Sequence, residues 1–332
     1  MPKAKSSDPK PMHSIYDLAT ELGVSASTVS RVLNQRGRIA ASTRQRVLDS
    51  ARAAGFRPRM AARQITIALV MDRQRYAGMS GFIPFLISNL VGVLSRHEVE
   101  VELFSEQNLN RLHDRHIDGV LAMAWDDATI DILKKLKNVP VVTLNRMDCP
   151  EFSSVATDHY GSAAMAVDAF YAKGHRKMAL LCEERENWGA RQRTQAFLDR
   201  TKAHGLPVDE QFIAYTNHQP MYGQIRRLLS LGPTAIFVAE ENLGIEAMYI
   251  LKEVLNVKVP DEVSIIGMEL SQVSQFLSPP LTAVMQPLGD LSTAALDLLL
   301  KHITEGTREP MQVMLDNRLI ERESVATLHP KE

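Results

Sequence analysis

The sequence has few cysteines and no long apolar run, and both features limit the classes of protein to which it can belong. Its two cysteines, Cys149 and Cys182, have neither paired spacing nor the spacing of metal ligands. We therefore expect inert, buried thiols in a reducing compartment. No stretch approaches the ~18 apolar residues of a membrane-spanning helix, and the first residues, MPKAKSSDPKPMH, lack the apolar core of a secretory signal. The sequence thus predicts a cytoplasmic protein.

The groupings of side chains that catalysis requires are also missing from the sequence. We find no nucleophile with its base, no metal-ligand cluster and no phosphate-binding loop. The adjacent acids Glu240 and Glu241 would point in different directions at the start of a helix. We therefore expect a protein that is not an enzyme and that needs neither a cofactor nor a metal.

A chain of 332 residues with 45% apolar composition is long enough for two or three globular units. Its overall charge of −1 is unevenly distributed. Residues 1–64 hold twelve lysines and arginines against four acids, a net charge of +8, so the rest of the chain carries −9. A basic head on an acidic body is the pattern expected when only the head meets phosphate.

Residues 14–34, SIYDLATELGVSASTVSRVLN, have the pattern of two short helices joined by a tight turn. Apolar residues from Ile15 to Leu22 recur at the spacing of one helical face, and Gly23 can end that helix in a left-handed conformation. Ser25 can cap a second helix. The outward face of this second helix would carry Ser27, Thr28, Ser30, Arg31 and Asn34.

This arrangement is a helix-turn-helix whose second helix fits the major groove of DNA. A third helix is predicted at about 42–54, with Ser42 as its cap and Gly55 as its end. The alternative is a helical subdomain with a solvated arginine face. The helix-turn-helix spacing and the positive charge agree with each other, and both favour DNA binding.

The same stretch, followed by TRQRVLDSARAAGFRPRMAARQ, resembles the head of the lactose-repressor family of bacterial transcription regulators. The resemblance implies a near-palindromic, double-stranded operator as a partner. Arg31 is the strongest candidate for reading a base, because its fork can bond O6 and N7 of guanine together. The implied DNA-binding residues are Ser25, Ala26, Ser27, Thr28, Ser30, Arg31, Asn34, Arg59, Met60, Arg63 and Ile65.

Beyond Ile67, apolar strand-like runs alternate with helical segments, which predicts an α/β body of two doubly wound lobes with parallel sheets. Ligands in such folds bind beyond the carboxyl ends of the strands, which here means the crevice between the lobes. The runs are 67–71, 100–104, 119–123, 140–145, 178–181, 235–239 and 263–267, and the helical patterns lie near 84–96, 128–137, 161–172, 191–204, 220–230, 241–255 and 288–304.

The body resembles the same family, whose sensor domain is built like a periplasmic sugar-binding protein. Segments such as VATDHYGSAAMAV, KGHRKMALL and VPDEVSIIGME occur in family order, so the resemblance covers residues 14 to about 325. It implies a basic arm at 1–13, a helix-turn-helix domain at 14–56, a shortened hinge at 57–65, and an effector-binding and dimerisation domain at 66–328. The lobes would exchange strands, with lobe one at about 66–170 and 284–311 and lobe two at about 171–283 and 312–328.

Candidate effector-binding residues lie at strand ends; Asp158, for example, follows the strand-like SSVAT. A carboxylate and an arginine in one crevice suit polyhydroxyl ligands, because ionised groups make strong hydrogen bonds to hydroxyls. Helix capping is the alternative role for each acid. Arg193 matches the family's ligand-binding arginine through RTQAF, and Phe85 matches a pocket-lining residue. The implied set is Phe85, Met123, Asp158, Trp188, Arg193, His218, Glu240 and Glu269.

Three acidic residues depart from the family pattern. Glu240 and Glu241 replace the usual Asn-Asp pair, and Glu269 replaces an aspartate. These longer side chains change the outline of the pocket, so the ligand of a relative cannot be transferred to this chain.

We expect a homodimeric, operator-binding transcription regulator, in its simplest form a repressor, whose DNA affinity changes with a small polar ligand such as a carbohydrate or related polyol. The sequence leaves open the identity of the effector, whether it releases or recruits DNA, and whether the assembly stops at a dimer. The alternative is a cytosolic solute-binding sensor with weak or lost DNA binding.

The stretch GFRPRMAARQITIALVMD joins the basic head directly to an apolar run. By resemblance, residues 57–63 correspond to a hinge that becomes a helix on operator DNA, where the family inserts a leucine into the minor groove. The leucine position is Ile65, where the first strand also begins. Ile65 would have to act both as the wedge in the minor groove and as the first residue of the strand. Either Met60 or no residue acts as the wedge, or the strand frays on DNA.

Overall fold

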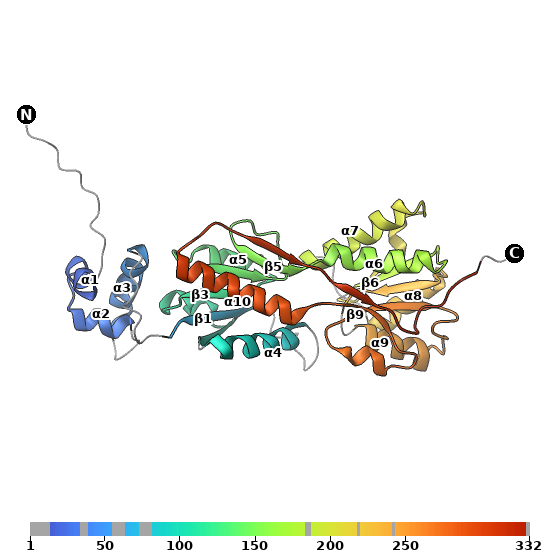
Figure 1. Cartoon of the computed structure of the whole chain (residues 1–332), viewed down its shortest axis with the longest axis horizontal. Coiled ribbons are helices and arrows are strands. Elements are labelled where there is room, and N and C mark those ends of the chain that lie inside the picture. The colour runs from blue at the N-terminus through green and yellow to red at the C-terminus, as the bar shows by residue number, and fades with distance from the viewer. Residues whose placement is uncertain are drawn as a thin grey trace, which may run out of the picture. The chain divides into compact units, whose positions relative to one another are not determined.

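The computed structural model describes residues 14–33, 39–54, 64–72, 82–97, 99–182, 187–217, 220–240 and 243–329. It contains a helical head and an α/β body with two six-stranded sheets (Figure 1). The predicted fold class is therefore confirmed. Within the described residues, every helix is too short or too polar to cross a membrane.

Three helices form the head: α1 (Ile15–Leu22), α2 (Ala26–Leu33) and α3 (Ala41–Ala53). Gly23 ends α1 in the left-handed conformation, with φ of 65°, as the sequence predicts. The third helix begins one residue earlier than expected, so Ser42 lies inside its first turn instead of capping it. The predicted helix end at Gly55 lies outside the described residues. The head has its own core, formed by Leu18, Ala19, Val29, Val32, Leu33, Val47, Leu48 and Ala51.

The first sheet has the strand order β11-β5-β4-β3-β1-β2. Strand β1 pairs in parallel with both β2 and β3, and β11 pairs in parallel with β5. The strands β1 and β3 to β5 are buried along their whole length. Burial on both faces fits the almost continuous apolar sequences of β1, β3 and β4, whereas β5 is buried although it contains Ser153, Ser154 and Thr157. The bounds are β1 (Thr66–Met71), β2 (Glu100–Ser105), β3 (Gly119–Met123), β4 (Val141–Leu144), β5 (Ser153–Thr157) and β11 (Gln312–Leu315).

The second sheet has the strand order β12-β10-β9-β8-β6-β7. Its neighbouring strands are parallel except for β10 and β12, which are antiparallel. The bounds are β6 (Met178–Cys182), β7 (Ile213–Tyr215), β8 (Ala235–Val238), β9 (Ser264–Glu269), β10 (Thr282–Met285) and β12 (Arg318–Ile320).

The helices of the body are α4 (Phe82–Leu94), α5 (Asp127–Lys134), α6 (His159–Ala172), α7 (Trp188–Ala203), α8 (Met221–Ser230), α9 (Leu243–Tyr249) and α10 (Leu288–Glu305). One π-helical turn, Ile250–Val254, continues α9, and a short helix η6 (Gln272–Phe276) follows β9. Each strand and helix predicted in the body is present within three residues of its expected ends, apart from the region 241–255, where Glu241 lies outside the described residues.

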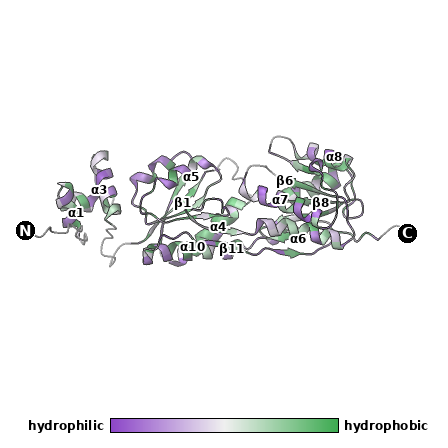
Figure 2. Cartoon of the chain, turned by 90° about the horizontal axis from the view of Figure 1, so that it is seen from above, coloured by the Kyte–Doolittle hydropathy of each residue, from purple (hydrophilic) through white to green (hydrophobic). Residues whose placement is uncertain are grey.

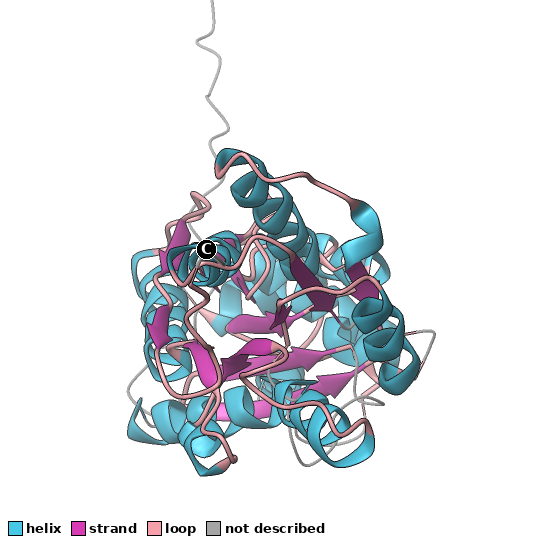
Figure 3. Cartoon of the chain, turned by 90° about the vertical axis from the view of Figure 1, so that its right-hand side faces the viewer, coloured by secondary structure: helices cyan, strands magenta, loops and turns pink. Residues whose placement is uncertain are grey.

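The second sheet buries a different set of side chains on each face, because successive residues of a strand point to opposite sides. Leu180 and Phe237 pack with α6 and α7, whereas Leu181 and Ile236 pack with α8 and α9. Helices therefore cover both faces, and strands lie between helices in Figure 3. Polar and apolar residues are mixed along α8 (Figure 2), and its apolar side faces the sheet.

The chain passes between the two sheets three times, after β5, after β10 and after β11. Buried side chains tie these crossings together. The Thr157 hydroxyl donates to Gln286 Oε1 at 2.9 Å, and Asn317 Nδ2 donates to the Asp158 carbonyl at 2.9 Å. Residues far apart in sequence are thus joined where the chain changes sheet.

The strand pairing differs from the expected lobe boundaries in two places. Strand β11, within 312–315, belongs to the first sheet, so the return to the second sheet occurs near Asn317 instead of at 312. Helix α6 packs on the second sheet, so the first crossing lies near Asp158 instead of at 170. Strands β7, β10, β11 and β12 are not among the predicted runs; β11 and β12 are partly exposed and carry little apolar sequence signal. The division into lobes itself stays a prediction.

Contacts between residues divide the chain into two compact units. One consists of Met1–Gln74, Leu94–Val142 and Leu298–Glu309, and the other of Arg75–Val93, Thr143–Asp297 and Pro310–Glu332. In the first unit, α10 lies close against β3, because a Cβ atom on Gly119 would stand 2.8 Å from Leu299 Cδ1. Each unit therefore contains segments that are distant in the sequence.

Candidate functional site

The start of α2 carries a cluster of hydroxyl groups. Ser25 Oγ accepts the Thr28 amide at 3.1 Å, which makes it the N-cap that the sequence predicts. The same oxygen lies 2.9 Å from Ser27 Oγ and 2.8 Å from Thr28 Oγ1. The helix start is thereby fixed, and Ser27 remains exposed. Arg31, one turn further along α2, is also exposed, whereas Ala26 and Ser30 are half-buried.

Side chains of α3 hold the turn between α1 and α2 in place. Arg46 Nη2 donates to the Leu22 carbonyl at 2.9 Å, so a cation satisfies the C-terminal end of α1. Ser50 Oγ donates to Glu21 Oε1 at 3.3 Å. These contacts fix the angle between the helices of the head, which a helix-turn-helix needs in order to place α2 in a groove.

The joint between head and body is described only from Gln64 onward. Ile65 is half-buried, and its carbonyl accepts the Glu100 amide at 2.8 Å. The sheet pairing thus begins at Ile65, as the sequence predicts. Of the other DNA-binding candidates, Asn34, Arg59, Met60 and Arg63 lie outside the described residues.

In the body, the structure brings Arg193 and Glu240 together at the carboxyl end of the second sheet. Arg193 lies in α7, which follows β6, and Glu240 follows β8. The Arg193 side chain is only 4% exposed and forms an ion pair with Glu240 through Nη2. A buried guanidinium requires such a partner.

His159, the first residue of α6, completes this group. Its Nδ1 lies 3.0 Å from Arg193 Nη1. Burial and the Arg193 charge hold the pKa of His159 well below its usual value, so the ring is neutral at pH 7 and Nδ1 can accept a hydrogen bond from Arg193 Nη1. The Trp188 ring meets the His159 ring edge-on, with 5.3 Å between centroids. We call His159, Trp188, Arg193 and Glu240 the arginine cluster.

Gly189 makes room for the His159 ring. A Cβ atom on Gly189 would stand 2.9 Å from His159 Nε2 and 3.1 Å from Cδ2. The first turn of α7 can therefore approach α6 closely only because this position has no side chain. Neither His159 nor Gly189 was identified from the sequence, although His159 directly follows the candidate Asp158.

Two predicted effector acids have internal roles. Asp158 caps α6, because its Oδ1 accepts the Gly161 amide at 2.7 Å. Glu269 is 2% exposed; its carboxylate accepts from Arg322 Nη2 at 2.8 Å and from the Ser274 amide at 3.2 Å. Glu269 is therefore the counterion of Arg322, and its contact with an effector stays a prediction.

The remaining effector candidates are less informative. Met123 is buried at the carboxyl end of β3, and its contact with an effector stays a prediction. Phe85 is half-buried on α4 and stays a prediction. His218 lies outside the described residues. Both cysteines are buried and free, as expected, and burial raises the pKa of Cys182 to about 12.

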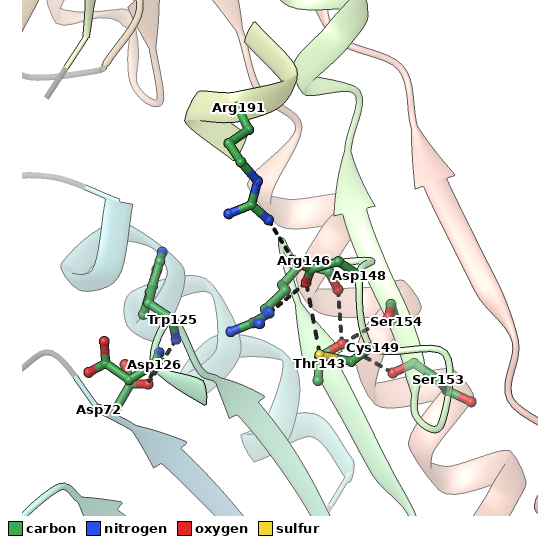
Figure 4. A network of polar contacts seen from close by, with 10 residues as sticks. All are labelled: Asp72, Trp125, Asp126, Thr143, Arg146, Asp148, Cys149, Ser153, Ser154 and Arg191. Atoms are coloured by element: carbon green, nitrogen blue, oxygen red, sulfur yellow. Dashed lines mark hydrogen bonds and ion pairs between the residues drawn. The ribbon is translucent and has the colours of Figure 1, made fainter. Parts of the chain in front are cut away.

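A second charged network, which the sequence reading missed, joins the loop after β4 to the start of α7 (Figure 4). Asp148 Oδ1 accepts from Arg146 Nε at 2.6 Å, and Oδ2 accepts from Arg191 Nη2 at 2.8 Å. The loop is held by Thr143, whose hydroxyl donates to the Arg146 carbonyl at 3.0 Å. Among the described residues, no group of His, Cys, Asp and Glu side chains is arranged to hold a metal ion.

The packing of His159 on Gly189 predicts a destabilising effect of Gly189→Ala. The added methyl would push the His159 ring away from Arg193, so the free energy of unfolding should fall by ~1–3 kcal/mol. Urea denaturation measures this change. Gly223→Ala is the matched control, because Gly223 lies in α8 with nothing within 4 Å of the added carbon, and it should raise stability by ~0.5–1 kcal/mol. Equal stability of the two variants would contradict the packing.

Sequence comparison finds relatives that match nearly the whole chain. The regulator CelR of Thermobifida fusca is 28% identical, covering 92% of this chain and 96% of its own. Catabolite control protein A of Priestia megaterium is 28% identical, with coverage of 93% and 98%. The repressor PurR of Mannheimia succiniciproducens is 27% identical, with coverage of 95% and 99%.

Solved structures agree with these sequence matches. A complex of the regulator CelR with cellobiose has a TM-score of 0.71 at 26% identity and covers 94% of this chain and 100% of its own. A lac repressor dimer bound to operator and an anti-inducer has a TM-score of 0.69 at 22% identity, with coverage of 96% and 100%, and supports the fold alone.

Two protein families match the chain, one in the head and one in the body. Residues 14–59 match the bacterial regulatory proteins of the lacI family, and residues 167–325 match the periplasmic binding protein-like domain. The first match covers the helix-turn-helix with its capped α2, and the second covers the sheet that carries the arginine cluster. The chain therefore combines a DNA-binding domain of the lacI family with a periplasmic binding protein-like domain, and its relatives over nearly the whole length are transcription regulators.

Proposed function

We propose that this chain is a homodimeric repressor that binds a near-palindromic operator through α1 to α3, and that a small polar ligand controls its operator affinity. The observation that carries the proposal is the capped α2 with its exposed Arg31, in a chain whose second sheet holds the arginine cluster at its carboxyl end. Two-fold symmetry would let two heads read two half-sites.

The arginine cluster suits a ligand rich in hydroxyl groups. Arg193 supplies donors, Glu240 supplies acceptors, and the partly exposed Trp188 offers an aromatic surface. Charged partners strengthen hydrogen bonds to hydroxyls. The cellobiose bound to the relative CelR supports a carbohydrate or related polyol as the effector class. We further propose a cytoplasmic protein without enzymatic activity, because the relatives are transcription regulators.

Control of DNA affinity requires that the ligand prefer one arrangement of the body. A ligand with such a preference shifts the population toward that arrangement, and operator affinity changes by the same coupling energy. A coupling of ~1–3 kcal/mol corresponds to a five- to 150-fold change in operator affinity. The expectation that the ligand lies between two lobes is part of this proposal.

Operator recognition is tested by selecting duplexes from random DNA with the full-length protein. Arg31→Ala should weaken binding to the selected duplex by ~1–3 kcal/mol and relax the preference at one base pair, because a bidentate contact is lost. Arg226→Ala in α8 is the control of equal charge and should leave the preference unchanged. A wild-type protein that selects no sequence at matched salt would instead favour the alternative function, a solute sensor without operator binding.

The direct joint is tested by inserting a short Gly/Ser linker after Gln64. Because Ile65 is already paired with Glu100, the joint has few unpaired residues between head and body. The insertion should therefore weaken the response to effector and broaden the range of half-site spacings that the protein binds. Operator binding to duplexes of stepped spacing measures both effects. Unchanged affinity and response would remove any special role for the joint.

The homodimer is tested at exposed apolar side chains of the second unit. Phe276 in η6 is 81% exposed, and Tyr249 and Val273 are also exposed, as expected of a protein interface. Phe276→Asp should shift sedimentation from dimer toward monomer by placing a charge in the interface. Val208→Asp, at an apolar side chain that is 43% exposed, should leave the dimer intact. If Phe276→Asp dimerises as strongly as wild type, the interface lies elsewhere.

A further inference from the structure

The arginine cluster holds one positive charge and one negative charge away from solvent. The side chain of Arg193 is 4% exposed and that of Glu240 is 15% exposed. A guanidinium keeps its proton at neutral pH, and a carboxylate in contact with it is favoured in its ionised form. The ion pair therefore adds no net charge to the carboxyl end of the second sheet.

Two further titratable side chains beside this pair are neutral. The His159 ring carries no charge at pH 7, because burial and the Arg193 charge lower its pKa. Cys182, the last residue of β6, interacts electrostatically with both Arg193 and Glu240, and burial raises its pKa to about 12. The thiol thus keeps its proton at pH 7. These four side chains together carry no net charge.

Both terminal nitrogens of Arg193 already donate hydrogen bonds within the cluster. Nη2 donates to Glu240, and Nη1 donates to His159 Nδ1. A carboxylate or phosphate binds a guanidinium best through two parallel hydrogen bonds, and here it would have to displace Glu240 in order to form them. The displaced carboxylate would then be a buried charge without its cation, which is costly.

A hydroxyl group of a ligand meets no such obstacle. It can accept a remaining proton of Arg193 or donate to Glu240, because a hydroxyl is both a donor and an acceptor, and the ion pair stays intact. Residue 240 is also a position where the chain departs from the pattern of the family that it resembles, which has asparagine there. An amide would leave Arg193 without this negative charge, so the glutamate changes which ligands the cluster tolerates.

We infer that Glu240 is a specificity-determining residue, which lets the arginine cluster accept neutral polyhydroxyl ligands and makes it reject anionic ones such as sugar acids and sugar phosphates. Specificity of this kind comes from an unfavourable charge placed against the wrong ligand. The inference rests on the proposed function, because it narrows the effector class of the same site.

The experiment measures thermal shifts of the full chain with three pairs of sugars: D-glucose and D-glucuronate, D-galactose and D-galacturonate, and cellobiose and cellobiuronate. The members of a pair differ in one hydroxymethyl group, which is a carboxylate in the acid. A ligand of the folded state raises the melting temperature according to its affinity, so each pair gives a ratio of two affinities. Matched ionic strength keeps the screening of charges equal.

For wild type, we expect the neutral member of the stabilising pair to bind about ten-fold or more tightly than the acid. Glu240→Gln keeps the size of the side chain and removes its charge, so the ratio should shift toward the acid by about ten-fold or more. The acid should also raise the melting temperature of this variant, because its carboxylate replaces the lost partner of Arg193.

Two controls separate the effect of the charge from effects on the fold. Glu240→Asp keeps the charge and should still reject the acids. Glu210→Gln removes an equal charge from the short helix η4 (Glu210–Phe212), which precedes β7 at the opposite end of the sheet, and it should leave the ratio of wild type unchanged. If Glu240→Gln does not fold, Glu240→Asn, with the amide usual in the family, provides the same comparison.

The opposite results would overturn the inference. Equal affinity of wild type for the two members of a pair would mean that the cluster does not select by charge, and the proposed function would stand. The same conclusion would follow from an equal ratio in wild type and Glu240→Gln. If no sugar stabilises either protein, the inference and the proposed carbohydrate effector both fail, whereas operator selection still decides DNA binding.

Discussion

The body depends on keeping the Arg193 charge buried at the end of the second sheet. A guanidinium cannot lose its proton at neutral pH, so its surroundings must provide acceptors. Glu240 supplies a charged acceptor and His159 a neutral one. These two residues come from the ends of β8 and β5, and Gly189 allows the helices that carry His159 and Arg193 to meet. One buried charge thereby links α6, α7 and the end of β8.

Much of the fold follows from periodicity alone. The stripes of apolar residues at 15–22 and the β-branched run at 67–71 identify elements because burial requires their patterns. Ser25 and Gly23 also act as expected, because caps depend on neighbouring residues only. Short exposed strands such as β11 leave no such pattern, since only one side of them is covered.

The candidate site was harder to predict for a physical reason. Arg193 and Glu240 were identified, but the sequence does not show which acid forms an ion pair with which arginine. Glu269 meets Arg322, which is 53 residues away in the chain, and its role as a counterion depends on packing that no local pattern records.

The three crossings have a consequence for biosynthesis. The first sheet receives β11 and the second receives β12, both from residues 312–320. Neither sheet is complete until the ribosome has translated this segment, so β5 presents an open edge from residue 157 onward, and β10 from residue 285 onward, until β11 and β12 are made. Open edges recruit other strands, and partly folded chains of this kind aggregate readily. The nascent chain is therefore most vulnerable just before β11 and β12 emerge, when chaperone protection matters most.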